Sequence, residues 1–208
     1  MKKLLLLFAI AVMLRSISFA AVGCDLNDPD RDVKRFFPSS TGYRTEYYSI
    51  RKLGGERLLA TVEAMLGDRF KGLYETIDVP YTLYTVLQSR EVIGYIHGVN
   101  QKGKYGGIQV FLVLDPKGTI NDLYFQKMTA RYSGKFRARS FTINFSGLKL
   151  NDFDDYNVKS GKYPDKSVLK RIANPDKDAG QDFLAIMRAV KKNLILMEVF
   201  IFKRGGGK

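Results

Sequence analysis

The chain has 208 residues and a formal net charge of +13, with 45% hydrophobic and 26% charged side chains. This composition is that of an ordinary globular protein able to bury a core, and the length suits one domain plus an export segment. The single cysteine excludes an intrachain disulfide framework.

The first 23 residues are predicted to be an export signal. Two lysines, Lys2 and Lys3, precede the apolar run LLLLFAIAVML at residues 4–14. The tripeptide Ser18-Phe19-Ala20 has the small residues of a signal cleavage site. The apolar run is too short for a good transmembrane helix, so we expect an exported, periplasmic protein.

Cys24 allows two interpretations of the cleavage site. The stretch Ala21-Val22-Gly23-Cys24 resembles a bacterial lipoprotein box, in which cleavage precedes the cysteine and its sulfur receives a lipid. Acyl chains at Cys24 would anchor the domain on the outer side of the cytoplasmic membrane. Cleavage after Ala20 would instead leave a free thiol.

The positive charge bears on the partners. Without residues 1–23, which hold three basic residues and no acid, the chain keeps a formal charge of +10. An exported protein seldom meets nucleic acid, so no nucleic-acid partner is expected. Anionic lipid headgroups or an acidic protein fit this charge, and a solvated basic surface without a specific partner is the simpler alternative.

The first half of the domain begins with weak signals. Residues 24–42 are polar and rich in turn formers, which predicts a tether with one short helical turn at Asp28-Pro29. Residues 43–50 predict a strand. Apolar residues at helical spacing predict an amphipathic helix over residues 55–66, which Gly67 ends.

Four consecutive strands follow. Their predicted ranges are Tyr81–Gln88, Val92–Val99, Gly107–Asp115 and Thr119–Lys127. The connections between them are too short for crossovers, so the strands form an antiparallel meander. The third strand is nearly all apolar, which indicates a central position in the sheet.

The remaining chain adds helices. Phe136, Phe141 and Phe145 share one face at helical spacing, and Asp178–Lys192 predicts a second amphipathic helix. The apolar segment Leu194–Phe202 predicts a last strand. The expected fold class is α+β, an antiparallel meander packed with two or more amphipathic helices, in a single domain over residues 43–208.

The sequence offers little for hydrolytic or metal chemistry. His97 is the one histidine, and no G-x-S-x-G nucleophile motif is present. The acidic cluster at residues 152–155 lacks the spacing and the glycine of a calcium loop. We therefore predict no catalytic residue and no metal site, and we expect a redox carrier or a binding domain rather than a stand-alone enzyme.

The order of the motifs carries a family resemblance. Gly107-Ile108 leads into the central strand, Asp115-Pro116-Lys117-Gly118 follows as a turn, and Phe141-x-x-x-Phe145-Ser146-Gly147 precedes a helix that ends in Ala189-Val190. Over residues 90–195 this order resembles the FMN-binding domain of flavin-carrying subunits of sodium-pumping quinone reductase and Rnf-type electron-transport complexes. The resemblance implies an FMN cofactor, electron transport, and a redox protein or membrane complex as partner.

The chain departs from that family at two motifs. The family's last helix begins with Ser-Gly-Ala-Thr, whose Thr is joined to FMN through a phosphoester. The corresponding stretch here is Asp178-Ala179-Gly180-Gln181, which has no hydroxyl group. The family's Glu-Thr-Pro-Gly loop is also absent, and residues 128–134 stand in its place. The resemblance therefore implies FMN that is bound non-covalently, if it is bound.

The cofactor site that the resemblance implies has three parts. They are the glycine-rich turn (Tyr105, Gly106, Gly107), the loop after the last strand of the meander (Thr129, Arg131, Ser133, Lys135) and the helix start (Gly180, Gln181). Hydroxyls, cations and free helix N–H groups are suited to a phosphate, and glycines leave space for a flat ring.

Each of these residues also has a simpler interpretation. The glycines can serve only as a turn, Tyr105 can pack, and Arg131 and Lys135 can be solvated surface. Two functions follow from this choice. One is electron transfer at the cell envelope by an FMN-binding-like domain. The other is a cofactor-free binding or structural module that keeps the fold.

Overall fold

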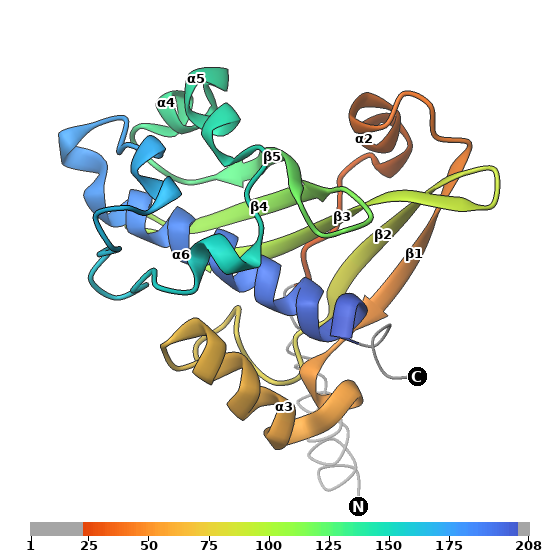
Figure 1. Ribbon diagram of the computed structural model, residues 1–208, viewed down its shortest axis with the longest axis horizontal. Helices are drawn as coiled ribbons and strands as arrows, with labels where there is room; N and C mark the ends of the chain where they lie inside the picture. Colours follow the sequence, from red (N-terminus) through yellow and green to blue (C-terminus); the bar gives the residue numbers. More distant parts are fainter. Residues whose placement is uncertain (1–22, 204–208) are drawn as a thin grey trace, which may run out of the picture.

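A computed structural model describes residues 23–203, and residues 1–22 of the predicted export signal lie outside them. A five-stranded antiparallel sheet of order β1-β2-β3-β4-β5 forms the centre of the molecule (Figure 1). The strands are β1 Gly42–Tyr48, β2 Tyr81–Gln88, β3 Glu91–Lys102, β4 Gly107–Leu114 and β5 Ile120–Met128. The helices are α2 Pro29–Phe36, α3 Ile50–Leu66, α4 Ser133–Arg137, α5 Arg139–Thr142 and α6 Gly180–Met197. The predicted α+β fold with an antiparallel meander is confirmed.

Helix α3 confirms the predicted helix and extends it by a kinked first turn. Ser49 caps its start by accepting a hydrogen bond from Lys52 N at 3.3 Å. Gly55 interrupts the helical backbone with φ 58°. Gly67 ends α3 in the left-handed region with φ 73°, and its N–H donates to Glu63 O at 2.9 Å. Glycine adopts this conformation without the penalty of a side chain, which explains why the helix stops there.

The sheet separates two hydrophobic cores. Along β4, alternate residues point to opposite faces, so Val110 and Leu112 belong to the larger core, whereas Phe111 and Val113 belong to the smaller one. Helices α3 and α6 cover the larger core on one face of the sheet, and α2 lies on the other face (Figure 1). Because both faces are covered, β4 is a nearly continuous apolar run. The run predicted a central strand, and β4 is an interior strand beside the edge strand β5, whereas β3 is the middle strand.

Residues 24–42, predicted to be a tether, are instead part of the folded domain. Cys24 and Leu26 are 2% and 4% exposed, and they pack with α2 in the smaller core. Leu26 N donates to the Tyr84 hydroxyl at 3.0 Å, and Gln126 Nε2 donates to Asp25 O at 2.8 Å. We call residues 23–28 the N-terminal strap. Its polar residues, which suggested a tether, bind the sheet instead of solvent.

The predicted last strand at Leu194–Phe202 is wrong. Helix α6 continues to Met197, and Glu198–Phe202 adds a wider helical turn. Residues 194–197 are all less than 4% exposed. A helix that is buried on every side shows no amphipathic periodicity, and a short apolar run of this kind resembles a strand.

The phenylalanines at helical spacing form one packed group, as predicted. Phe136, Phe141 and Phe145 lie in α4, α5 and the 3₁₀ turn Ile143–Phe145. Neighbouring rings meet edge-to-face with centroids 5.2 and 5.4 Å apart.

Within residues 23–203, none of the helices is long and apolar enough to span a bilayer.

Candidate functional site

The residues that the sequence singled out gather at one end of the sheet. The glycine loop, residues 103–107, joins β3 to β4 and is closed by Gly103 N donating to Gly106 O at 2.8 Å. Thr129, just after β5, donates its N–H to Gly107 O at 3.1 Å. A Cβ on Gly106 would lie 2.9 Å from the Cβ of Thr129, so this close approach requires glycine.

The start of α6 reaches the same end of the sheet. Asp182, in its first turn, is 1% exposed and accepts a hydrogen bond from Lys104 N at 2.7 Å. Lys135, in α4, forms a 2.7 Å ion pair with Asp176, which precedes α6. These two contacts join the glycine loop, the segment after β5 and the start of α6. The structure therefore brings together the three parts of the predicted site.

The predicted cationic and aromatic residues lie at the surface of this region. Tyr105 is 50% exposed, and the Lys104 ammonium lies 5.1 Å from the centre of its ring. The Tyr105 ring therefore packs on neither hydrophobic core. Arg131 is exposed, with its guanidinium 5.5 Å from the Tyr132 ring centre. Lys135 is held by Asp176, and this ion pair raises the pKa of the Lys135 ammonium.

The first turn of α6 is open but carries negative charge. A Cβ at Gly180 would meet no atom within 4 Å, and Gln181 is exposed. No side chain caps this turn, because the N-cap residue is Ala179. The Asp182 carboxylate lies where the helix dipole favours an anion, so it already satisfies part of that preference. Ser133 begins α4 nearby, and its N–H donates to Ala130 O at 3.2 Å.

A groove borders the glycine loop on the side of the larger core. This glycine groove has a volume of about 370 Å³, within the usual size range for small-ligand pockets. Its lining consists of Lys71, Gly72, Leu73, Tyr74, Glu75, Gln101, Lys102, Gly106 and Gly107. The Tyr74 hydroxyl lies 3.0 Å from where a Cβ on Gly107 would be, so glycine at 107 lets that ring approach the strand. Two predicted residues, Gly106 and Gly107, thus line a groove.

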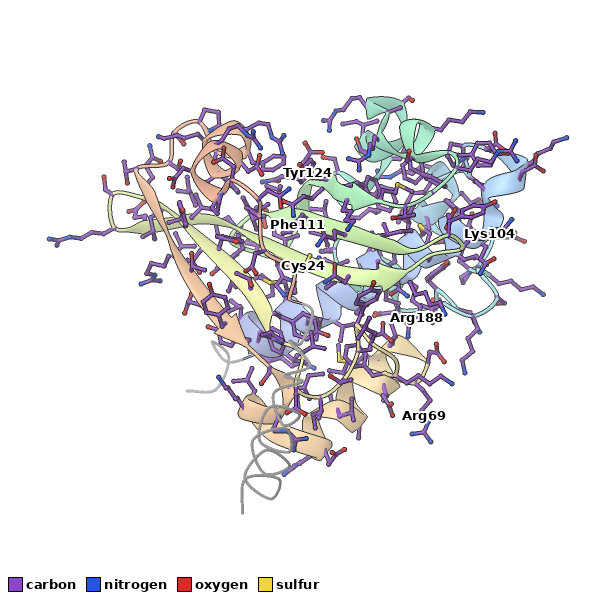
Figure 2. All side chains as sticks on the ribbon, turned by 180° about the vertical axis from the view of Figure 1, so that it is seen from behind. Cys24, Arg69, Lys104, Phe111, Tyr124 and Arg188 are labelled. Atoms are coloured by element: carbon purple, nitrogen blue, oxygen red, sulfur yellow. The ribbon has the colours of Figure 1, made fainter. Side chains whose placement is uncertain are left out.

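A buried ion network lies against the wall of the glycine groove. Lys192, 0% exposed, donates from Nζ to Glu75 Oε1 at 2.7 Å, to Asn100 O at 2.7 Å and to Gln101 Oε1 at 3.0 Å. Arg188, one turn earlier in α6, binds both Glu75 oxygens and also donates to Gln101 at 3.1 Å. Figure 2 shows Arg188 between the sheet and Arg69, which lies in the segment after α3. One buried and one partly buried cation therefore share one carboxylate.

The charges in this network stabilise one another. Burial alone would raise the pKa of Glu75, but Lys192 and Arg188 outweigh it and hold that pKa below its ordinary value. Burial lowers the pKa of Lys192, and the Glu75 carboxylate opposes this change. Every ammonium proton of Lys192 has an acceptor, so we assign the pair as ionised. Arg188 also pairs with Asp68 at 3.4 Å, so the two cations face two carboxylates and the wall of the groove is polar and fixed.

Sequence reasoning missed the residues that make the groove and its wall. Tyr74 and Glu75 lie in the irregular segment between α3 and β2, which no motif distinguishes. Arg188 and Lys192 carried a signal, because they occupy positions i and i+4 of a helix that is otherwise largely apolar. Two cations on such a helix indicate buried partners.

His97, in β3, lies in the core beside Asn193 of α6, the residue that follows Lys192. Its side chain is 0% exposed, and Nδ1 lies 2.7 Å from Asn193 Oδ1. Asn193 Nδ2 donates in turn to His97 O at 2.9 Å. Among the residues that the structure describes, Nε2 of His97 has no hydrogen-bond partner. Burial lowers the pKa of His97 to about 4, so the imidazole is neutral at pH 7.

The comparisons with known proteins place the fold. No family model and no curated sequence matches this chain. Among solved structures, the chain is similar to NqrC of Shewanella oneidensis, with a TM-score of 0.55 and 12% sequence identity. The match covers 95% of this chain and 98% of NqrC. At this identity the match shows a shared fold over nearly the whole chain.

Proposed function

We propose that this chain is an FMN-binding electron-transfer domain of the cell envelope, with the flavin held non-covalently. The fold shared with NqrC, one of the flavin-carrying subunits that the order of motifs resembles, supports this proposal. The observation that carries the proposal is the convergence of the glycine loop, Thr129 and the start of α6 at one end of the sheet. The glycine groove lies at that end.

The residues present fit a flavin in part. Gly106 and Gly107 clear the backbone beside the groove, and Tyr74 provides a flat side chain on its lining. Lys71 and Lys102 supply cations on the same lining, and both are exposed. A phosphate needs hydrogen-bond donors and positive charge, which these lysines can provide. Thr129, Ser133 and Arg131 lie beside this region and are the further candidates for the phosphate.

The start of α6 supports non-covalent binding, because it lacks the attachment residue that the related family uses. No serine or threonine occurs after Ser167, so residues 178–181 cannot form a phosphoester. When bound, FMN accepts one or two electrons by its own chemistry. The chain needs only to bind it, orient it and supply fixed charge. The ion network of Glu75, Arg188 and Lys192 lies against the groove wall and would present fixed polar groups to a ligand there, while Lys71 and Lys102 supply the positive charge.

The cellular setting is part of the proposal. The predicted export signal and the basic composition support a domain outside the cytoplasm that contacts an anionic membrane surface or an acidic redox partner. The likeness to NqrC supports a membrane complex as that partner. A lipid on Cys24 is a separate matter, because the sulfur would have to leave the smaller core, where Cys24 is 2% exposed.

A cofactor-free binding module is the second candidate, and one observation favours it. Asp182 places a buried carboxylate at the start of α6, where the related family holds a phosphate. The carboxylate would repel a phosphate there unless Arg131 and the groove lysines compensate. This module would keep the fold and bind a partner through its basic surface.

Absorption spectroscopy after mixing with FMN and desalting separates the two candidates. Flavin bands that survive desalting and are released by acid precipitation support the proposal. A colourless protein overturns it in favour of the cofactor-free module, and bands that stay with the precipitate contradict non-covalent binding.

Lys102→Gln should weaken FMN binding about tenfold, the usual effect of losing one charge-assisted hydrogen bond. The control is Lys117→Gln, at the opposite end of β4.

A further inference from the structure

A second cleft lies at the free edge of the sheet, away from the glycine groove. We call it the arginine cleft. It has a volume of about 320 Å³ and is lined by Arg35 of α2, Arg137 of α4, Arg139 of α5 and four consecutive residues of β5, 122–125. Tyr124, on this part of β5, lies between α2 and the α4–α5 pair in Figure 2. Three guanidiniums from three separate helices thus reach one cleft.

Each guanidinium in the cleft is held in place. Arg35 lies 4.2 Å from the Phe36 ring centre and 4.4 Å from the Tyr124 ring centre, and it pairs with the buried Asp32 at 3.4 Å. Arg137 donates to two carbonyl oxygens of β5, those of Phe125 and Gln126. A guanidinium has five N–H donors, so both arginines keep donors for another acceptor. Fixed donors bind a ligand with a smaller loss of side-chain entropy.

Arg139 forms an ion pair with Asp122, the acidic residue of the cleft lining. Its Nη1 lies 2.7 Å from Asp122 Oδ1, and the two side chains are 61% and 32% exposed. With Asp122 as the only acid among the lining residues, the lining side chains carry two net positive charges. Arg35 also pairs with Asp32, which lies outside the lining, so the cleft keeps a positive balance that fits an oxyanion.

Protection of the sheet edge does not account for the cluster. β5 is the last strand of the sheet, and a basic side chain on an edge strand can prevent pairing with another chain. Arg137 has this role, because it binds the β5 carbonyls. Arg35 and Arg139 instead contact aromatic rings and carboxylates. Edge protection thus accounts for Arg137 but not for the convergence of Arg35 and Arg139 on the same cleft.

We infer that the arginine cleft binds a phosphate monoester group, held by Arg35, Arg137 and Arg139. This site is separate from the proposed flavin site and does not depend on it. A phosphate presents three oxygens to the guanidiniums, and arginine forms paired hydrogen bonds with such groups. The group can belong to a soluble phosphorylated molecule or to a lipid headgroup.

Titration of the full chain with inorganic phosphate tests the site. NMR signals of the arginine Nε–H groups are followed at constant ionic strength, with chloride replaced by phosphate. Saturable shifts are expected. Arg139→Gln should weaken binding about tenfold, through loss of charge-assisted hydrogen bonds. Asp122→Asn should tighten it about fivefold, because the amide keeps its acceptor oxygen and removes the negative charge.

The opposite signs of these two changes make the test specific. Both substitutions break the same ion pair, so a purely structural role would move binding in the same direction. Arg51→Gln is the matched control. Arg51 is an exposed arginine of α3 that pairs with Asp78, and both residues lie outside the cleft. Equal weakening by Arg51→Gln and Arg139→Gln, weakening by Asp122→Asn, or shifts that never saturate would each overturn the inference.

Sedimentation with vesicles identifies the source of the phosphate. Vesicles of phosphatidylcholine containing phosphatidate present a phosphate monoester on a lipid, and pure phosphatidylcholine vesicles are the blank. If the variants rank in the same order with phosphatidate vesicles and with free phosphate, the site accepts a lipid headgroup. If the ranking holds only for free phosphate, the ligand is a soluble phosphorylated molecule. Either result supports the site.

Discussion

Acidification should destabilise this fold through its single histidine. In the folded state the pKa of His97 is lowered to about 4, because the imidazole is buried and Nε2 has no acceptor for a second proton among the described residues. In the unfolded chain the pKa is near its ordinary value of about 6.5. Between these two values the unfolded state binds the extra proton and the folded state does not. The free energy of unfolding must therefore fall as the pH falls through this window.

The size of this effect follows from the two pKa values. Each pH unit inside the window corresponds to about 1.4 kcal/mol, so the decrease between pH 6.5 and pH 5 is about 2 kcal/mol. The full window down to a pKa of about 4 corresponds to about 3 kcal/mol. A loss of this size is a large fraction of the stability of a typical domain.

Urea unfolding at pH 7, 6 and 5 measures the effect, with His97→Gln as the matched variant. Glutamine does not titrate, so the variant should lose about 2 kcal/mol less than the parent between pH 6.5 and pH 5. A lower stability of the variant at pH 7 does not affect this difference in slope. Carboxylates such as Glu75, whose pKa lies below its ordinary value, act at lower pH. Parallel pH profiles for the two proteins would refute the assignment of His97 as a buried, neutral side chain.

Three further predictions concern the core and the helix ends. Lys192→Met should lower the free energy of unfolding by about 3–5 kcal/mol, because Glu75 then loses a buried partner. Urea titration measures this, and an unchanged midpoint of urea unfolding would contradict the ion network. Gly67→Ala should cost about 1 kcal/mol through strain at φ 73°, whereas Gly134→Ala, in α4 with open space around it, should not destabilise; thermal unfolding compares the two. Burial raises the pKa of the Cys24 thiol, so iodoacetamide should label it only after unfolding, and fast labelling of the native chain would argue against the packed strap.

The strands were predictable because their patterns are local. Alternation and short turns fixed the meander over residues 81–127, and Gly67 marked the end of α3 correctly. Leu194–Phe202 was assigned to the wrong class because uniform burial removes the helical period. The strap was missed because its polar residues bind partners far along the chain, such as Gln126 for Asp25.

The candidate site was predictable only where a motif existed. The glycines at 106 and 107 could be singled out from the sequence, and they line the groove. The position of Glu75 opposite Lys192 depends on a contact between residues 117 positions apart, and no local pattern encodes such a pair. Asp182 was also missed, although it changes the electrostatics of the very turn where the resemblance placed a phosphate.

The N-terminal strap has a consequence for the order in which the chain can fold. Residues 23–28 are synthesised before the sheet, yet Asp25 and Asn27 bind Gln126, about a hundred positions later. The smaller core therefore cannot close until β5 has emerged and joined the sheet. During that interval the Cys24 sulfur is accessible, whereas afterwards it is buried. Any enzyme that modifies Cys24 thus competes in time with the completion of the sheet.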